Sequence, residues 1–143
     1  MYITQGADDL EKYLAAWPPA RDDLKRAFLE LAQEAGSLES ARGSFLARPG
    51  ISHSLRFTLE PPPPGRERPV FFLIDVVEIG DDLLLSVCFY ADEISDPDGR
   101  GNEIPGALFG ETGYCFDVED HDPELLAYLK ARLHSAPRAA AGV

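Results

Sequence analysis

The spacing of apolar residues divides the chain into helical and extended segments. Three segments, 10–17, 24–35 and 125–133, repeat apolar residues every three or four positions, and each is expected to form a helix with one buried stripe. Two prolines follow the first stripe, Gly36 follows the second and Asp122 precedes the third, as is typical of helix ends and starts. The pattern predicts two N-terminal helices and one C-terminal helix.

Five other segments have the alternation or the continuous apolar runs of strands. They are 44–48, 51–59, 69–78, 83–92 and 113–118. The turn at Gly80-Asp81 fixes the register of the third and fourth strands, and it predicts that Asp75 lies opposite Ser86 and Leu73 opposite Cys88. We therefore expect a mainly antiparallel sheet of about five strands in meander order.

One face of the central strands is wholly apolar, with Val70, Phe72 and Ile74 on the third strand. An apolar sheet face must be covered, so all three helices are expected to lie on it, giving an α+β fold. The other face carries polar residues and ends at Tyr90 and Asp92, and a site on the sheet is expected there. Residues 1–135 are predicted to form a single domain and residues 136–143 a frayed tail.

The formal charge of this chain of 143 residues is −12, and it is concentrated in one segment. Residues 69–122 contain fourteen acidic residues and one basic residue, Arg100. Such a field repels phosphate groups, so nucleic acid and anionic membrane surfaces are not expected partners. A cationic protein or small ligand is the expected partner.

The N-terminal residues have neither the basic nor the apolar region of a signal peptide, and no apolar run reaches the ~20 residues of a membrane helix. A cytoplasmic location is expected. Cys88 and Cys115 have no metal-ligand spacing, so we expect two buried, reduced thiols. No cofactor is expected.

Residues 93–112 are expected to form a long loop, and long loops in compact domains are often functional. If the loop binds a metal, its ligands would be Asp92, Asp96, Asp98 and Glu103, because carboxylate oxygens suit calcium and magnesium. The EF-hand pattern fails, since Arg100 occupies a ligand position, and turn chemistry explains the same residues without a metal.

Two side chains stand out as chemical candidates. Asp75 lies inside an apolar strand and needs a partner, for which Ser86, Arg48 or Arg56 is available, or else a functional role. His53 alternates with apolar residues, which is typical of a hydrogen-bonded core histidine, and it becomes a candidate base only near Asp75 or Asp92. The predicted ligand-binding residues are His53, Arg56, Asp75, Tyr90, Asp92 and Asp117.

No nucleophile or phosphate-loop motif is present in the sequence. Pro61–Pro64 with Arg66 fits a PxxPx+ ligand pattern, but a proline loop between strands explains it as well. The leading hypothesis is a non-enzymatic binding or regulatory module that uses its polar sheet face and acidic loop to meet a cationic partner. The alternative is a metal-assisted hydrolase using Asp75, Asp92 and His53. A homodimer through an exposed face or edge of the sheet is compatible with either.

Overall fold

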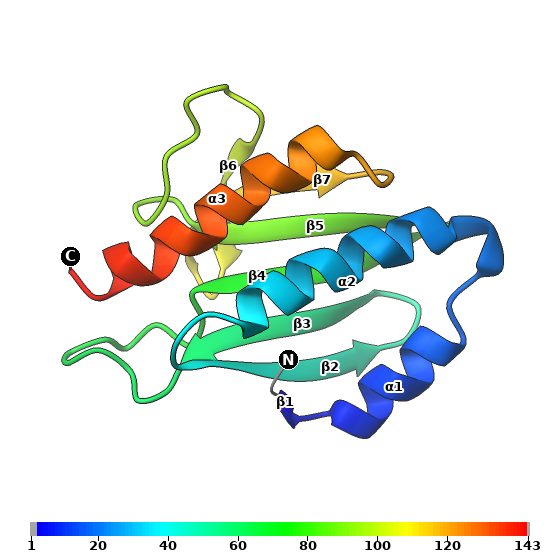
Figure 1. Ribbon diagram of the computed structural model, residues 1–143, viewed down its shortest axis with the longest axis horizontal. Coiled ribbons are helices and arrows are strands. Elements are labelled where there is room, and N and C mark those ends of the chain that lie inside the picture. Colours follow the sequence, from blue (N-terminus) through cyan, green and yellow to red (C-terminus); the bar gives the residue numbers. More distant parts are fainter. Residues whose placement is uncertain (1–2, 143) are drawn as a thin grey trace.

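The computed structural model describes residues 3–142, which form one mixed seven-stranded sheet covered on one face by helices (Figure 1). The spatial order of the strands is β1-β2-β3-β4-β5-β7-β6. In the described part of the chain, β1 and β2 are the only pair of neighbouring strands that run parallel. The strands are β1 (Ile3–Gln5), β2 (Ala41–Arg48), β3 (Ser52–Leu59), β4 (Phe72–Ile79), β5 (Asp82–Tyr90), β6 (Asn102–Leu108) and β7 (Glu111–Val118).

The five strands expected from the sequence correspond to β2, β3, β4, β5 and β7. The meander from β2 to β5 and the β4–β5 register are confirmed, with Asp75 opposite Ser86 and Leu73 opposite Cys88. The α+β class is therefore confirmed, because alternating apolar patterns and one short turn determine this part of the fold.

Two strands were missed, so the prediction of about five strands is corrected to seven. β6 lies within the expected loop, contains Pro105 and exposes most of its residues, which fits an edge strand. β6 pairs with the outer side of β7, so the end of the sheet is not a simple meander. β1 has three residues, too few to show a periodic pattern.

The helices lie on the expected face of the sheet, but the first of them packs mainly against β2, so the prediction that all three cover the central strands is only partly correct. They are α1 (Ala7–Ala15), the short 3-10 helix η1 (Pro19–Arg21), α2 (Asp22–Gly36) and α3 (Pro123–Ala140). Phe28 and Leu31 of α2 and Leu129 of α3 are fully buried in one cluster with Phe72 and Val87 of the sheet. Burial of each such side chain stabilises the fold by about 1.5–3 kcal/mol.

A bend before β4 changes the face on which two neighbouring residues lie. Strand β4 begins at Phe72, and the preceding Phe71 belongs to the main core. Val70 instead joins a second apolar cluster with Leu73, Cys88, Tyr90, Leu108 and Cys115. The expectation that Val70 faces the helices is therefore wrong, because strict alternation does not extend through the bend.

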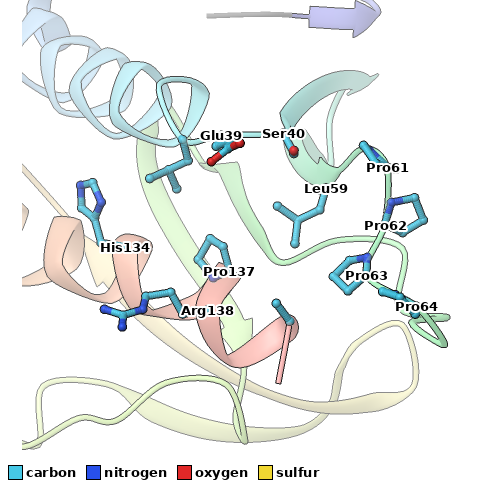
Figure 2. Close-up of a pocket in the computed structure, with 12 residues that line it drawn as sticks. Glu39, Ser40, Leu59, Pro61, Pro62, Pro63, Pro64, His134, Pro137 and Arg138 are labelled. Atoms are coloured by element: carbon cyan, nitrogen blue, oxygen red, sulfur yellow. The ribbon is translucent and has the colours of Figure 1, made fainter. Parts of the chain in front are cut away.

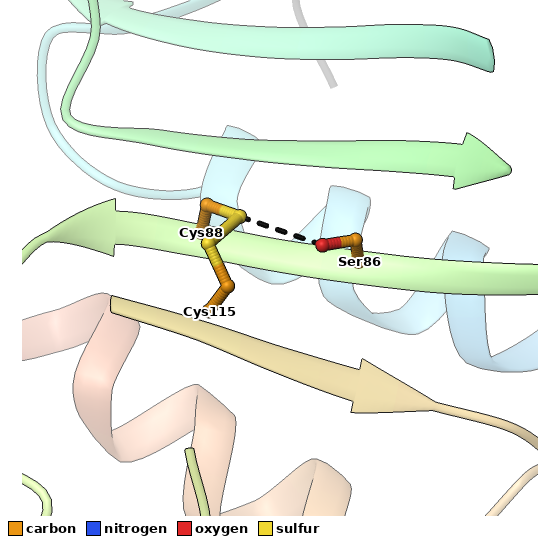
Figure 3. The surroundings of a disulfide bond; sticks show 3 residues. All are labelled: Ser86, Cys88 and Cys115. Atoms are coloured by element: carbon orange, nitrogen blue, oxygen red, sulfur yellow. Dashed lines mark hydrogen bonds between the residues drawn. A yellow bond between two sulfur atoms is a disulfide. The ribbon is translucent and has the colours of Figure 1, made fainter. Parts of the chain in front are cut away.

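Cys88 and Cys115 form a disulfide between β5 and β7 (Figure 3). Both residues are buried as expected, but the prediction of reduced thiols is wrong. The two cysteines are direct cross-strand partners, a register that the sequence alone did not supply. Because disulfides persist mainly in oxidising compartments, the cysteines no longer support a cytoplasmic location.

Helix α3 is longer than expected. Asp122 caps it by accepting hydrogen bonds from the backbone N–H groups of Glu124 and Leu125. The helix continues to Ala140 and buries Ala136, so much of the segment expected to fray is helical. Among residues 3–142, no helix combines the length and the apolar character needed to cross a membrane.

Candidate functional site

Four of the six predicted ligand-binding residues lie on the helix-free face of the sheet. Strand alternation places Arg56, Asp75, Tyr90 and Asp117 on this face. Asp75 and Asp117 lie in one cross-strand row on either side of Ser86. Within residues 3–142, the Oδ1 atom of Asp75 is buried and has no hydrogen-bond partner, so none of the partnerships expected for it, with Ser86 or with an arginine, is formed at that atom.

His53 lies on the opposite, helix-covered face. Its ring stacks on Tyr13 of α1 at 4.2 Å between centroids, and its Nε2 atom lies 2.9 Å from Oε1 of Glu78. Burial, together with the nearby charge of Glu78, raises the pKa of Tyr13 to about 12. The histidine helps to seat α1 on the sheet, as a core histidine does.

The three residues of the hydrolase hypothesis do not come together. The sheet separates His53 from Asp75, since their cross-strand partners are the neighbouring residues Val76 and Ser54. Asp92 follows β5 and lies six residues beyond the partner of Asp75, roughly 20 Å along an extended chain. These three side chains do not form one catalytic centre.

Asp92 instead belongs to a group that we call the arginine cluster: Arg66, Arg68, Asp92, Glu93 and Glu111. Its innermost contact is the pair of Arg66 and Glu93, whose side chains are only 8% and 6% exposed. Arg66 donates two hydrogen bonds to Glu93, at 2.6 and 3.1 Å, and one to the carbonyl oxygen of Val70 at 2.8 Å. Because Arg66 is buried, it cannot serve as the cation of a PxxPx+ ligand.

Arg68 joins the two exposed carboxylates of the arginine cluster. It donates to both oxygens of Asp92, at 2.8 and 3.0 Å, and to both oxygens of Glu111, at 2.8 and 3.1 Å. These hydrogen bonds raise the pKa of Arg68, and the bond from Arg68 holds the pKa of Asp92 below its ordinary value. Even so, the side chains of Asp92 and Glu111 remain 69% and 47% exposed. One guanidinium group thus fixes two carboxylates that still face solvent.

Tyr90 lies beneath the arginine cluster. The guanidinium carbon of Arg68 lies 4.2 Å from the centre of its ring, and that of Arg66 lies 5.8 Å away. Tyr90 is 1% exposed, and its hydroxyl has no hydrogen-bond partner within residues 3–142. Burial raises the pKa of Tyr90, and the charge of Glu111 raises it further.

The arginine cluster lines a polar cleft of about 650 Å³ between the 64–69 segment, the end of β5 and the β6–β7 turn. Phe109, at the tip of that turn, is exposed and forms part of the lining. Counting the buried Glu93 with the lining residues, two arginines meet four carboxylates, the fourth being Glu67. The cleft is therefore net negative and has an aromatic wall.

The expected metal loop is organised by hydrogen bonds around Asp96. Asp96 accepts them from the hydroxyls of Tyr114 and Tyr128 and from the backbone N–H groups of Arg100 and Gly101. Burial alone would raise the pKa of Asp96, but these bonds hold it well below its ordinary value. Within residues 3–142, no three side chains of His, Cys, Asp or Glu lie close enough together to hold a metal ion. The four predicted ligands, Asp92, Asp96, Asp98 and Glu103, therefore do not form such a group.

Sequence reasoning missed the basic half of the arginine cluster. Arg66 and Arg68 are the only basic residues between Arg56 and Arg100, and they directly precede the acidic segment. This isolation was a usable signal, because two cations next to many carboxylates are expected to pair with some of them. Comparison of the chain with protein-family models, with curated proteins and with solved structures finds no match.

Proposed function

We propose that the protein is a binding module that recognises a cationic group of a partner at the polar cleft. The observation that carries the proposal is the pair of carboxylates, Asp92 and Glu111, held by Arg68 and still exposed to solvent. Carboxylates that are already positioned lose little conformational entropy when they accept a further donor, and this favours binding.

The surroundings of the two carboxylates support the proposal. The buried pair of Arg66 and Glu93 helps to position Arg68, because Glu93 also forms an ion pair with Arg68 at 3.2 Å. The ring of Phe109 is exposed, and the guanidinium carbon of Arg56 lies 5.2 Å from its centre. An aromatic face beside carboxylates suits a guanidinium or ammonium group, since rings attract cations.

The other carboxylates of the acidic loop are less suited to bind a partner than expected from the sequence. Asp96 directs its oxygens into its own loop, and Glu93 is buried against Arg66. Among the acidic residues of the described range 3–142, only Asp92 and Glu111 combine a fixed position, exposure and a place in the cleft.

A titration of the ¹⁵N-labelled protein with hexa-arginine, followed by NMR, tests this function. We expect the largest amide shifts at residues 66–68, 91–93 and 109–112, and we expect them to shrink in the double variant Asp92→Asn/Glu111→Gln. Shifts spread evenly over the acidic surface, or unchanged in the double variant, would contradict the proposal.

A second proposal, self-association, rests on the placement of exposed apolar residues. Leu46 and Ile79 lie on the helix-free face, and Ile104 and Phe109 lie on the β6–β7 hairpin beside it. Exposed apolar patches often mark interaction surfaces. Sedimentation should show a dimer that Leu46→Glu/Ile79→Glu converts to a monomer, and a monomeric parent protein would remove this proposal.

We also propose that the protein resides in an oxidising compartment, because of its disulfide. Cys88 and Cys115 are joined, which favours an oxidising compartment over the cytoplasm expected from the sequence. Alkylation of thiols during cell lysis, followed by mass spectrometry, distinguishes the two. An unmodified pair supports the oxidised form, whereas two alkylated cysteines would restore the cytoplasmic expectation.

A further inference from the structure

A second, apolar cleft lies beside the polar one. It has a volume of about 560 Å³ and lies between the end of α2, the proline segment and the end of α3 (Figure 2). Pro61–Pro64 form one wall, Pro137 and Arg138 of α3 stand across from it, and Leu59 lies between them (Figure 2). Clefts of 300–1,000 Å³ with a mainly apolar lining are typical ligand sites.

The two clefts are neighbours and share a wall. Pro64 lines both, and the consecutive residues Ala140 and Ala141 at the end of α3 line the polar and the apolar cleft, respectively. One continuous ligand can therefore enter both clefts. In an extended peptide, which rises about 3.3 Å per residue, two side chains one to three positions apart would span such neighbouring sites.

We propose that the partner is a peptide segment in which an apolar side chain, best an aromatic one, lies one to three residues from a basic one. The apolar side chain enters the apolar cleft and the basic side chain pairs with Asp92 and Glu111. This inference rests on the proposed function and adds to it the chemistry of the partner.

The charges around the apolar cleft set the direction in which the segment lies. Arg138 stands on its α3 side, and His134 there is already paired with Glu34 at 2.9 Å. Arg138 repels a basic side chain, whereas the net negative polar cleft attracts it. Glu39 also lines the apolar cleft, on the side of α2, so an acidic segment gains nothing from entering it.

Three peptides separate the two parts of the inference: acetyl-GFGRRG-amide, acetyl-GSGRRG-amide and acetyl-GFGQQG-amide. Calorimetry should show that the first binds at least about tenfold more tightly than the second, because burial of one aromatic side chain is worth that factor or more. The first should also bind at least about tenfold more tightly than the third, because the polar cleft needs a cation.

A variant that fills the apolar cleft gives a control on the protein side. Ala141 is exposed at the end of α3, so Ala141→Trp should fold normally and abolish the preference for phenylalanine over serine. Ala131→Trp is the matched control, since Ala131 of α3 is also exposed but lines neither cleft nor the hollow beside Asp92 and Glu93, and it should keep the preference.

The outcomes distinguish a failure of this inference from a failure of the proposed function. Equal binding of the phenylalanine and serine peptides, with loss of binding by the glutamine peptide, would overturn the inference and leave the proposed function standing. A phenylalanine preference that survives in Ala141→Trp would overturn it as well. Equal binding of the glutamine and arginine peptides would remove the proposed function itself.

Discussion

Asp92 and Asp96 are four residues apart in one acidic stretch, but their carboxylates lie in different environments. Asp92 is held by a guanidinium from outside the stretch, that of Arg68, and remains largely exposed. Asp96 accepts hydrogen bonds from Tyr114, Tyr128 and the backbone of its own loop. The number of carboxylates in a sequence thus does not say how many remain available to a partner.

The two environments differ in what they stabilise. The arginine cluster joins three separate segments, 66–68, 92–93 and the start of β7, and leaves the carboxylates of Asp92 and Glu111 exposed to solvent. The Asp96 cluster fastens one loop to β7 and α3 and directs its oxygens inward. We assign partner binding to the first, whereas the hydrogen bonds of the second hold its own loop in place.

One of the two largest expected effects comes from breaking the buried pair in the arginine cluster. Arg66→Met leaves the buried carboxylate of Glu93 with Arg68, at 3.2 Å, as its one remaining ion-pair partner among residues 3–142, so we expect a loss of about 3 kcal/mol of unfolding free energy in urea. Arg66→Met/Glu93→Leu removes both charges and should recover most of this loss. A single variant as stable as the parent protein would show that the pair does not support the cluster.

Removal of the disulfide, which belongs to the same apolar cluster as Tyr90, is expected to lower the free energy of unfolding by a similar amount. Cys88 and Cys115 are 27 residues apart, and a loop of that length corresponds to a stabilisation of roughly 3.5 kcal/mol. Cys88→Ser/Cys115→Ser should lose about this amount in urea, and the parent protein should lose a similar amount in dithiothreitol. No change on reduction would mean that the strand ladder alone holds β5 to β7.

Asp96→Asn tests the other side of the comparison and should cost about 2 kcal/mol near pH 7, because hydrogen bonds to a charged group are lost. The pKa of Asp96 is lowered by folding, so its contribution is fully present above the unfolded pKa of about 4 and is lost as pH falls. The gap between parent and variant in urea should therefore narrow below about pH 5. Asp98→Asn is the control, and a gap independent of pH would contradict the assignment.

Asp92→Asn should have the smallest effect on stability. The carboxylate is 69% exposed, and exposed ion pairs usually contribute less than about 1 kcal/mol. We expect a loss below about 0.5 kcal/mol in urea, since Arg68 keeps its bonds to Glu111. A loss above about 1 kcal/mol would make Asp92 a structural residue and weaken its assignment to binding.

The sequence predicted the features that depend on local patterns. Alternation and one short turn were enough for β2 to β5 and for the pairing of Asp75 with Ser86. They were not enough for β6, whose Pro105 and exposed residues resemble a loop, or for the disulfide, which depends on a β5–β7 register set by a distant hairpin.

Of the residues in the proposed site, Tyr90 and Asp92 at the end of β5 were among those predicted from the sequence, whereas Arg66, Arg68 and Glu111 were not. These residues meet Asp92 only because the proline segment and the β6–β7 hairpin return to the end of β5. Such contacts between distant segments leave no periodic trace in the chain.

The most direct test compares two double neutralisations of equal charge. Calorimetry with acetyl-GFGRRG-amide should show that Asp92→Asn/Glu111→Gln weakens binding about tenfold, since two fixed carboxylates are removed from the cleft. Asp98→Asn/Glu103→Gln, which removes two exposed carboxylates that do not line the cleft, should weaken it less than about twofold. An equal loss in both variants would show that the partner responds to the net acidity of the surface, and the central claim would then be wrong.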